Sequence, residues 1–142
     1  MKKAFGYIVA VIMMLGLVAC EAEENYISVP FEEINCACVL KPDKLTPVVV
    51  YDKARFEELF RGAGPSVDFG SQFVIAVCGP STEKRTVIKI VEIQNKEQNL
   101  YVKYTIETGE DLSYKILPHS TVAVDRGYQD CVVAFYDVTG MK

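Results

Sequence analysis

The strict alternation of residues 100–108 constrains the fold most. Two sets of side chains alternate along it: Leu100, Val102, Tyr104 and Ile106, and between them Tyr101, Lys103, Thr105 and Glu107. A period of two predicts a strand with one face on a core and one face in water. Residues 73–78, FVIAVC, are apolar throughout and predict a central strand that is buried on both faces.

The rest of the pattern predicts further short strands and turns. The strands are expected at 26–31, 37–40, 47–51, 86–94, 121–124 and 131–136. The turns are expected at 95–99, at Gly109–Asp111 and around Arg126–Gly127. We therefore expect a mainly β, α+β fold, in which an antiparallel sheet forms a sandwich or an open barrel.

One short helix is predicted after Asp52, which can cap its N-terminus. Its apolar stripe is formed by Phe56, Leu59 and Phe60. Its end is predicted by Gly62, Gly64 and Pro65. A helix of about ten residues is marginal alone, so we expect it to pack on the sheet.

The N-terminus predicts export and lipid anchoring. Lys2 and Lys3 precede a short apolar run, Ala4–Leu15, and the sequence LVAC then ends at Cys20. This pattern is typical of a secretory signal peptide and resembles a bacterial lipobox, which implies cleavage before Cys20 and acylation of that residue. The alternative is an ordinary cleavage site that leaves Cys20 as a plain thiol.

We divide the chain into a signal peptide (1–19), a leading segment with the lipidated cysteine and an acidic tether (20–33), and one β-rich domain (34–142). The acidic run 21–25 resembles the signal that sends Bacteroidetes lipoproteins to the outer face of the outer membrane; it can equally be a solvated tether. We expect an outer-membrane lipoprotein on the periplasmic or the surface-exposed face.

Charge argues against a nucleic-acid partner. The chain has 142 residues, 15 Lys and Arg, and 19 Asp and Glu, a net charge of −4. Removing Lys2 and Lys3 leaves 13 basic residues against the 19 acidic ones. Phosphate binding needs a basic face, which this composition does not predict.

Four cysteines remain after Cys20: Cys36, Cys38, Cys78 and Cys131. An even number in an oxidising compartment favours disulfides, with the pairing open, although Cys78 and Cys131 can equally be buried thiols. A direct bond between Cys36 and Cys38 would close a small, strained ring. Cys36 and Cys38 with His119 can also be interpreted as a soft-metal site, but the C-x-C spacing is short for zinc.

No pattern in the sequence predicts an active site. His119 is the only imidazole and follows Pro118, where an edge or surface role is the ordinary one. The sequence holds no nucleophile elbow, P-loop or dinucleotide fingerprint. We therefore expect a protein that is not an enzyme and needs no cofactor.

One long stretch resembles a known family. Its motifs are VVVYD at 48–52, a helix with RFEELF at 55–60, VDFGSQFVIAV at 67–77, GPST at 79–82 and LPH at 117–119. The order and spacing resemble the protease-complex-stabilising lipoprotein family (PrcB-like), over residues 34–125. The family's Gly-Gly-Tyr step is replaced here by Glu83–Thr86, and residues 131–136 add a strand past its usual end.

The resemblance implies a non-catalytic domain that binds another protein, in the founding case a cell-surface protease. We predict partner contacts in two loops. The residues are Gly79, Pro80, Ser81, Thr82, Lys84, Arg85, Pro118 and His119. The alternative function is a small-ligand or metal-binding envelope lipoprotein.

Overall fold

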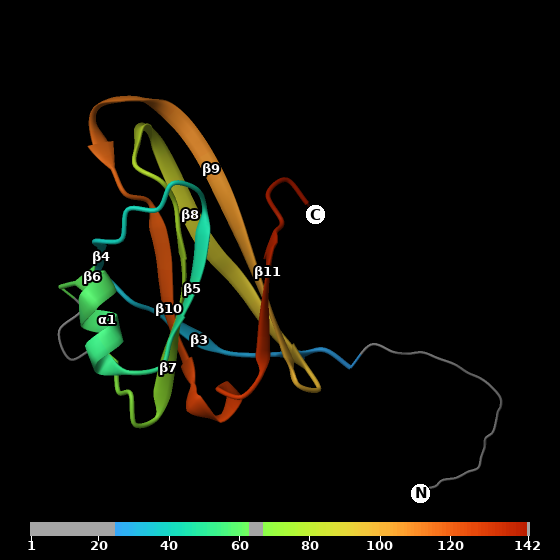
Figure 1. Ribbon diagram of the computed structural model, residues 1–142. Coiled ribbons are helices and arrows are strands. Elements are labelled where there is room, and N and C mark those ends of the chain that lie inside the picture. Colours follow the sequence, from blue (N-terminus) through green and yellow to red (C-terminus); the bar gives the residue numbers. More distant parts are fainter. Residues whose placement is uncertain (1–24, 63–66, 142) are drawn as a thin grey trace, which may run out of the picture.

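The computed structural model describes residues 25–62 and 67–141, which form two packed β-sheets with a helix against one of them (Figure 1). The strands are β2 (Ile27–Ser28), β3 (Phe31–Glu33), β4 (Ala37–Cys38), β5 (Thr46–Val50), β6 (Phe60–Arg61), β7 (Gln72–Cys78), β8 (Thr82–Lys96), β9 (Asn99–Ile116), β10 (His119–Asp125) and β11 (Val132–Asp137). The helices are α1 (Lys53–Leu59) and the 3-10 turn η2 (Arg126–Tyr128). The predicted mainly β, α+β fold is confirmed.

Each large sheet has four strands. Sheet I has the order β3-β10-β7-β5 and is antiparallel throughout. Sheet II has the order β11-β9-β8-β2, and its edge strand β11 runs parallel to β9. The strands β4 and β6 form a separate two-stranded sheet beside the helix.

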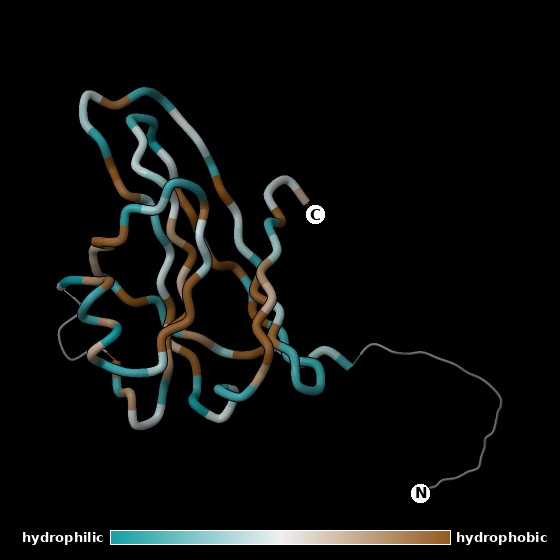
Figure 2. Tube along the Cα trace, viewed as in Figure 1, coloured by the Kyte–Doolittle hydropathy of each residue, from teal (hydrophilic) through white to brown (hydrophobic). Residues whose placement is uncertain are grey.

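Strand β7 is buried on both faces, as its composition predicts, because it belongs to two apolar layers. Phe73, Ile75 and Val77 pack between the two sheets, against Ile90 and Leu100 of sheet II. The alternate side chains of β7 point to the other side of sheet I, where helix α1 covers them. Figure 2 shows the apolar colour concentrated along the central strands and the polar colour at the hairpin tips.

The helix begins as predicted and ends earlier. Asp52 accepts a hydrogen bond from the backbone N–H of Arg55 at 2.8 Å, which caps the first turn. After Leu59 the chain becomes extended, and Phe60 pairs with Cys38 as strand β6. Phe60 is still buried, so the apolar stripe is confirmed although its last member lies outside the helix. The predicted end signals Gly64 and Pro65 lie outside the described residues.

The turn predicted at Gly109–Asp111 is wrong. Strand β9 runs through these residues to Ile116, because strand β8 begins at Thr82 and the ladder between the two strands continues past them. Lys84 pairs with Asp111 in this ladder, with register shifts on both sides of Lys84. The start of β8 and the end of β9 therefore extend past the sandwich as a two-stranded arm, at the top of Figure 1.

The domain also begins earlier than the predicted boundary at residue 34. Strand β2 pairs with β8, strand β3 pairs with β10, and Val29 between them is buried in the core. The signal peptide and Cys20 lie outside the described residues. No helix within the described ranges is long and apolar enough to cross a membrane.

Candidate functional site

The two predicted contact segments lie side by side at one end of the sandwich. The backbone N–H of Gly79 donates to the carbonyl of Pro118 at 2.8 Å. A Cβ atom at position 79 would lie 3.2 Å from the Pro118 ring and 3.1 Å from the Ile88 side chain, so a larger residue would require these neighbours to shift by a few tenths of an ångström. Residues 39 positions apart in the sequence thus form one surface, which we call the loop end.

The loop end contains more strand than the sequence predicts. Thr82, Lys84 and Arg85 belong to β8, and His119 begins β10, so only residues 79–81 and 117–118 are connections. Beside them lies a cavity of about 360 Å³. Its lining comes from β8 and β9 of sheet II, from both connections and from Leu45 just before β5: Leu45, Pro80, Thr82, Lys84, Thr86, Ile88, Ile106, Thr108 and Pro118.

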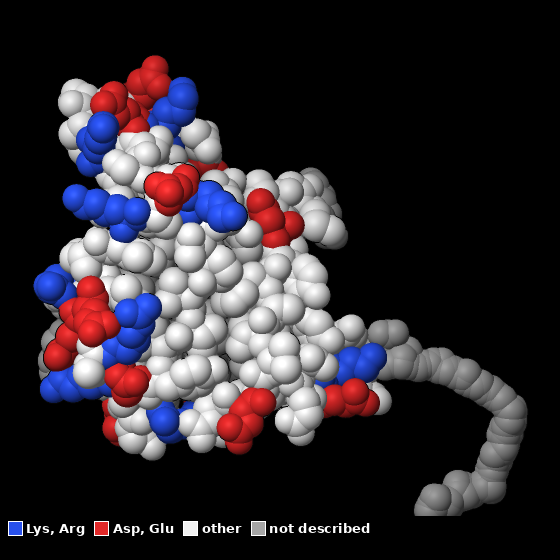
Figure 3. Space-filling view, viewed as in Figure 1, with Lys and Arg blue, Asp and Glu red and all other residues white. Residues whose placement is uncertain are grey.

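Charges on the arm beside this cavity are paired with one another. Lys84 Nζ lies 2.9 Å from Asp111 Oδ1, and Arg85 lies 3.8 Å from the carboxylate of Glu110. Figure 3 shows the mixed cluster of basic and acidic side chains at the end of the arm. Exposed ion pairs of this kind contribute little to stability.

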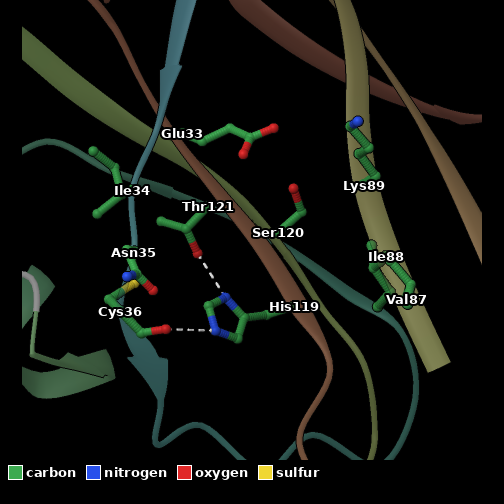
Figure 4. Close-up of a pocket in the computed structure, with 10 residues that line it drawn as sticks. All are labelled: Glu33, Ile34, Asn35, Cys36, Val87, Ile88, Lys89, His119, Ser120 and Thr121. Atoms are coloured by element: carbon green, nitrogen blue, oxygen red, sulfur yellow. Dashed lines mark hydrogen bonds between the residues drawn. The ribbon is translucent and has the colours of Figure 1, made fainter. Parts of the chain in front are cut away.

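A second cavity, of about 400 Å³, lies between β3, β8 and β10 and contains His119 (Figure 4). His119 Nε2 lies 3.0 Å from the carbonyl oxygen of Cys36, which can only accept, so Nε2 carries the proton. His119 Nδ1 then accepts from the hydroxyl of Thr121, 2.9 Å away. The ring joins β10 to the chain at Cys36.

Burial lowers the pKa of His119, and the hydrogen bond to the Cys36 carbonyl opposes this shift only in part. The ring is therefore neutral near pH 7, and both nitrogens are occupied. Sequence reasoning assigned His119 to the surface or an edge; the structure instead makes it a half-buried connection between two segments.

The four cysteines of the described chain are unbonded thiols, so the structure contains none of the predicted disulfides. Cys36, Cys38 and Cys78 gather on the helix side of sheet I, where the sulfurs of Cys38 and Cys78 are 3.7 Å apart. Cys131 packs against the other apolar layer, so it is not placed to form a disulfide with any of these three cysteines. Burial raises the pKa of Cys36 and, more strongly, of Cys78.

The metal interpretation finds no support in the geometry. Cys36 approaches His119 through its backbone carbonyl. Within residues 25–62 and 67–141, no group of three or more His, Cys, Asp or Glu side chains is arranged to hold a metal ion.

A third region, which sequence reasoning missed, lies on the outer face of sheet II. The rings of Tyr26 and Tyr101 meet edge to face with centroids 5.4 Å apart, and Tyr136 follows at 6.0 Å from Tyr101. Tyr26 is 43% exposed and Tyr136 is 48% exposed. We call these three residues and their surroundings the tyrosine face.

The tyrosine face surrounds a hollow of about 550 Å³. Its other lining residues are Gln94, Lys103, Asp137, Val138 and Met141. Lys103 lies 3.5 Å from Glu92, and Lys96 lies over the Tyr26 ring at 5.0 Å. Two hydrogen bonds from Thr139 lower the pKa of Asp137. The hollow thus combines exposed aromatic rings with charges of both signs.

The sequence contains one signal for this region. Tyr101 alternates with the buried side chains of β9, so it must point to the wet face, where an aromatic ring is unusual. The neighbouring Tyr136 has no such signal, because its position depends on the parallel pairing of β11 with β9.

Comparisons of this chain with protein-family models, with curated proteins and with solved structures find no match.

Proposed function

We propose that this chain is a lipid-anchored, non-catalytic protein of the cell envelope that binds another protein through its tyrosine face. The resemblance to the protease-complex-stabilising lipoproteins favours a surface or periplasmic protease as the class of partner. The observation that carries the proposal is the partly exposed aromatic surface formed by Tyr26, Tyr101 and Tyr136.

Tyrosine suits a binding surface for a physical reason. Its ring offers a large apolar area with few rotatable bonds, and its hydroxyl keeps it soluble when no partner is bound. Tyrosine is enriched at protein interfaces and among the residues that carry most of their binding energy. The nearby opposite charges, Lys103 and Asp137, are suited to orienting a partner of mixed charge.

The position of the face agrees with an N-terminal anchor. Tyr26 is six residues from Cys20, and a fully extended chain of six residues spans at most about 20 Å. If Cys20 carries the lipid, a partner on the tyrosine face is held close to the membrane surface.

The chemistry of the described residues favours binding over catalysis. His119 has both ring nitrogens in hydrogen bonds, and the raised pKa of Cys36 leaves its thiol protonated near neutral pH. Neither residue has the features of an activated base or nucleophile.

The test is crosslinking on intact cells of the native host, followed by identification of the proteins recovered with a C-terminal tag. Tyr101→Ser combined with Tyr136→Ser should abolish recovery of the dominant partner. Tyr114→Ser is the matched control, because Tyr114 is 61% exposed but lies on the arm at the loop end. Loss of the partner with Tyr114→Ser alone would overturn the assignment of the surface, and recovery of no enriched protein from the wild type would overturn the function.

The second candidate function, binding of a small polar ligand, is favoured by the cavity around His119. Glu33, Asn35 and Lys89 line it with both acidic and basic groups (Figure 4). A thermal-shift screen of small polar metabolites tests this function. A hit should be lost in Glu33→Gln and kept in Glu32→Gln, because Glu32 is absent from the lining.

A further inference from the structure

The thiols of two buried cysteines, Cys38 and Cys78, are in contact. Cys38 belongs to β4 and is 7% exposed, and Cys78 ends β7 and is fully buried. Their sulfurs are 3.7 Å apart, although 40 residues separate them in the sequence. A disulfide needs its two sulfurs about 2 Å apart, so this pair must approach by less than about 2 Å to bond.

The other two cysteines are placed differently. Cys36 is half-buried and lines the cavity of Figure 4, where its carbonyl binds His119. Cys131 packs in the apolar layer between the two sheets, with Asn95 as its polar neighbour at 3.8 Å. The sulfurs of Cys38 and Cys78 are thus in contact, whereas Cys36 lies in the same apolar layer and Cys131 lies in the other layer.

We propose that Cys38 and Cys78 form a disulfide in the exported protein and that Cys36 and Cys131 stay as thiols. The two thiols lose two electrons and two protons in total, and one sulfur–sulfur bond forms. The oxidant is a protein disulfide of the thiol-oxidase class, which is reduced to a dithiol by thiol–disulfide exchange.

The bond would stabilise the position of strand β4. Strand β4 has two residues and pairs only with the two residues of β6. It follows the N-terminal strands that lead from the predicted lipid anchor into the fold. A covalent link from Cys38 to the central strand β7 therefore fixes a weakly paired segment to the most buried strand of the domain.

The bond should form during folding. In the folded chain Cys78 is inaccessible to a protein oxidant, and burial raises the pKa of its thiol, which suppresses the reactive thiolate. Refolding of the reduced, denatured protein should thus form the bond much faster than oxidation of the folded, reduced protein.

The test starts from full-length mature protein purified from the host envelope and alkylated without reductant. Mass spectrometry should find Cys36 and Cys131 labelled, and Cys38 joined to Cys78. Fragment ions that break the chain between Cys36 and Cys38 identify which of the two is crosslinked. Labelling of all four cysteines, or a crosslink through Cys36 or Cys131, would overturn the proposal.

Single variants provide an independent measurement. Cys36→Ser and Cys131→Ser should each keep the crosslink, and reduction of either should lower the melting temperature by about 15 °C, as expected for the loss of a disulfide that closes a loop of this size. Cys38→Ser should melt at the temperature of the reduced protein and should not respond to reductant. A reductant response that persists in Cys38→Ser would contradict the pairing even if that variant is less stable.

Discussion

The two sheets share one core and differ on their outer faces. The outer face of sheet I is covered by helix α1 and by the β4–β6 pair, so Phe56, Leu59 and Phe60 are buried against it. The outer face of sheet II has no such cover among the described residues, and it presents the rings of Tyr26 and Tyr136 to solvent.

The two outer faces carry side chains of different chemistry, one set suited to stabilising the fold and the other to binding a partner. The covered face consists of aliphatic and phenylalanine side chains, whose removal from water stabilises the folded state. The open face uses tyrosine, which tolerates water and still gains from burial when a partner arrives.

Phe60→Ala should cause the largest loss of stability. Phe60 is almost fully buried and stacks on Phe56 with ring centroids 5.1 Å apart. Removing a buried phenylalanine ring costs about 3–5 kcal/mol of unfolding free energy, which is a large part of the stability of a domain of this size. Urea denaturation measures the loss, and a cost below about 1 kcal/mol would mean that the helix side is not a tightly packed face.

Tyr136→Ala should show the opposite behaviour. We expect a change of less than about 1 kcal/mol in the free energy of unfolding, because the ring is half exposed. Recovery of the bound partner should fall by about tenfold or more, as for a central interface residue. Quantitative recovery after crosslinking measures binding, with Tyr114→Ala as the control that should leave recovery unchanged.

His119→Gln should remove a pH dependence of stability. The folded protein holds the pKa of His119 below 6.5, so on acidification the unfolded chain binds a proton first. Protonation of this group therefore does not reduce the free energy of unfolding above pH 6.5. As the pH falls through that value, the free energy of unfolding decreases by at most about 1.4 kcal/mol per pH unit. Denaturation at pH 7.5 and 5.5 should therefore show a larger loss for the wild type than for the variant. Equal losses would contradict the neutral, hydrogen-bonded ring.

Lys84→Ala should have the smallest effect. The Lys84–Asp111 pair is exposed on the arm, so we expect a loss of less than about 0.5 kcal/mol. Asp111→Ala should give the same small loss, and the two together should show little coupling in a double-mutant cycle. A loss above about 1 kcal/mol would show that the arm contributes to the stability of the sandwich.

The sequence predicted the parts of the fold that depend on local pattern. The period of β9, the apolar run of β7 and the cap at Asp52 each follow from neighbouring residues, and the structure confirms them. The length of the β8–β9 arm was missed because Gly109, Glu110 and Asp111 are typical turn residues. Their extended conformation comes from pairing with a distant strand.

The candidate sites depend more strongly on distant pairings. The sequence places Tyr101 on a wet face, but only the parallel pairing of β11 with β9 brings Tyr136 beside it. The contact between Cys38 and Cys78 likewise requires β4 to fold back beside β7, which no spacing in the sequence reveals. The loop end was predicted as two loops, and their contact through Gly79 and Pro118 became visible only in the structure.

The most direct test of the central claim is site-specific photo-crosslinking on intact cells. A photoreactive amino acid is placed at position 136 on the tyrosine face, at position 114 on the arm, or at position 51, another exposed tyrosine. We predict one dominant crosslinked protein from position 136 and none from positions 114 and 51. A dominant product from position 114 with none from position 136 would contradict the claim and place the partner at the loop end.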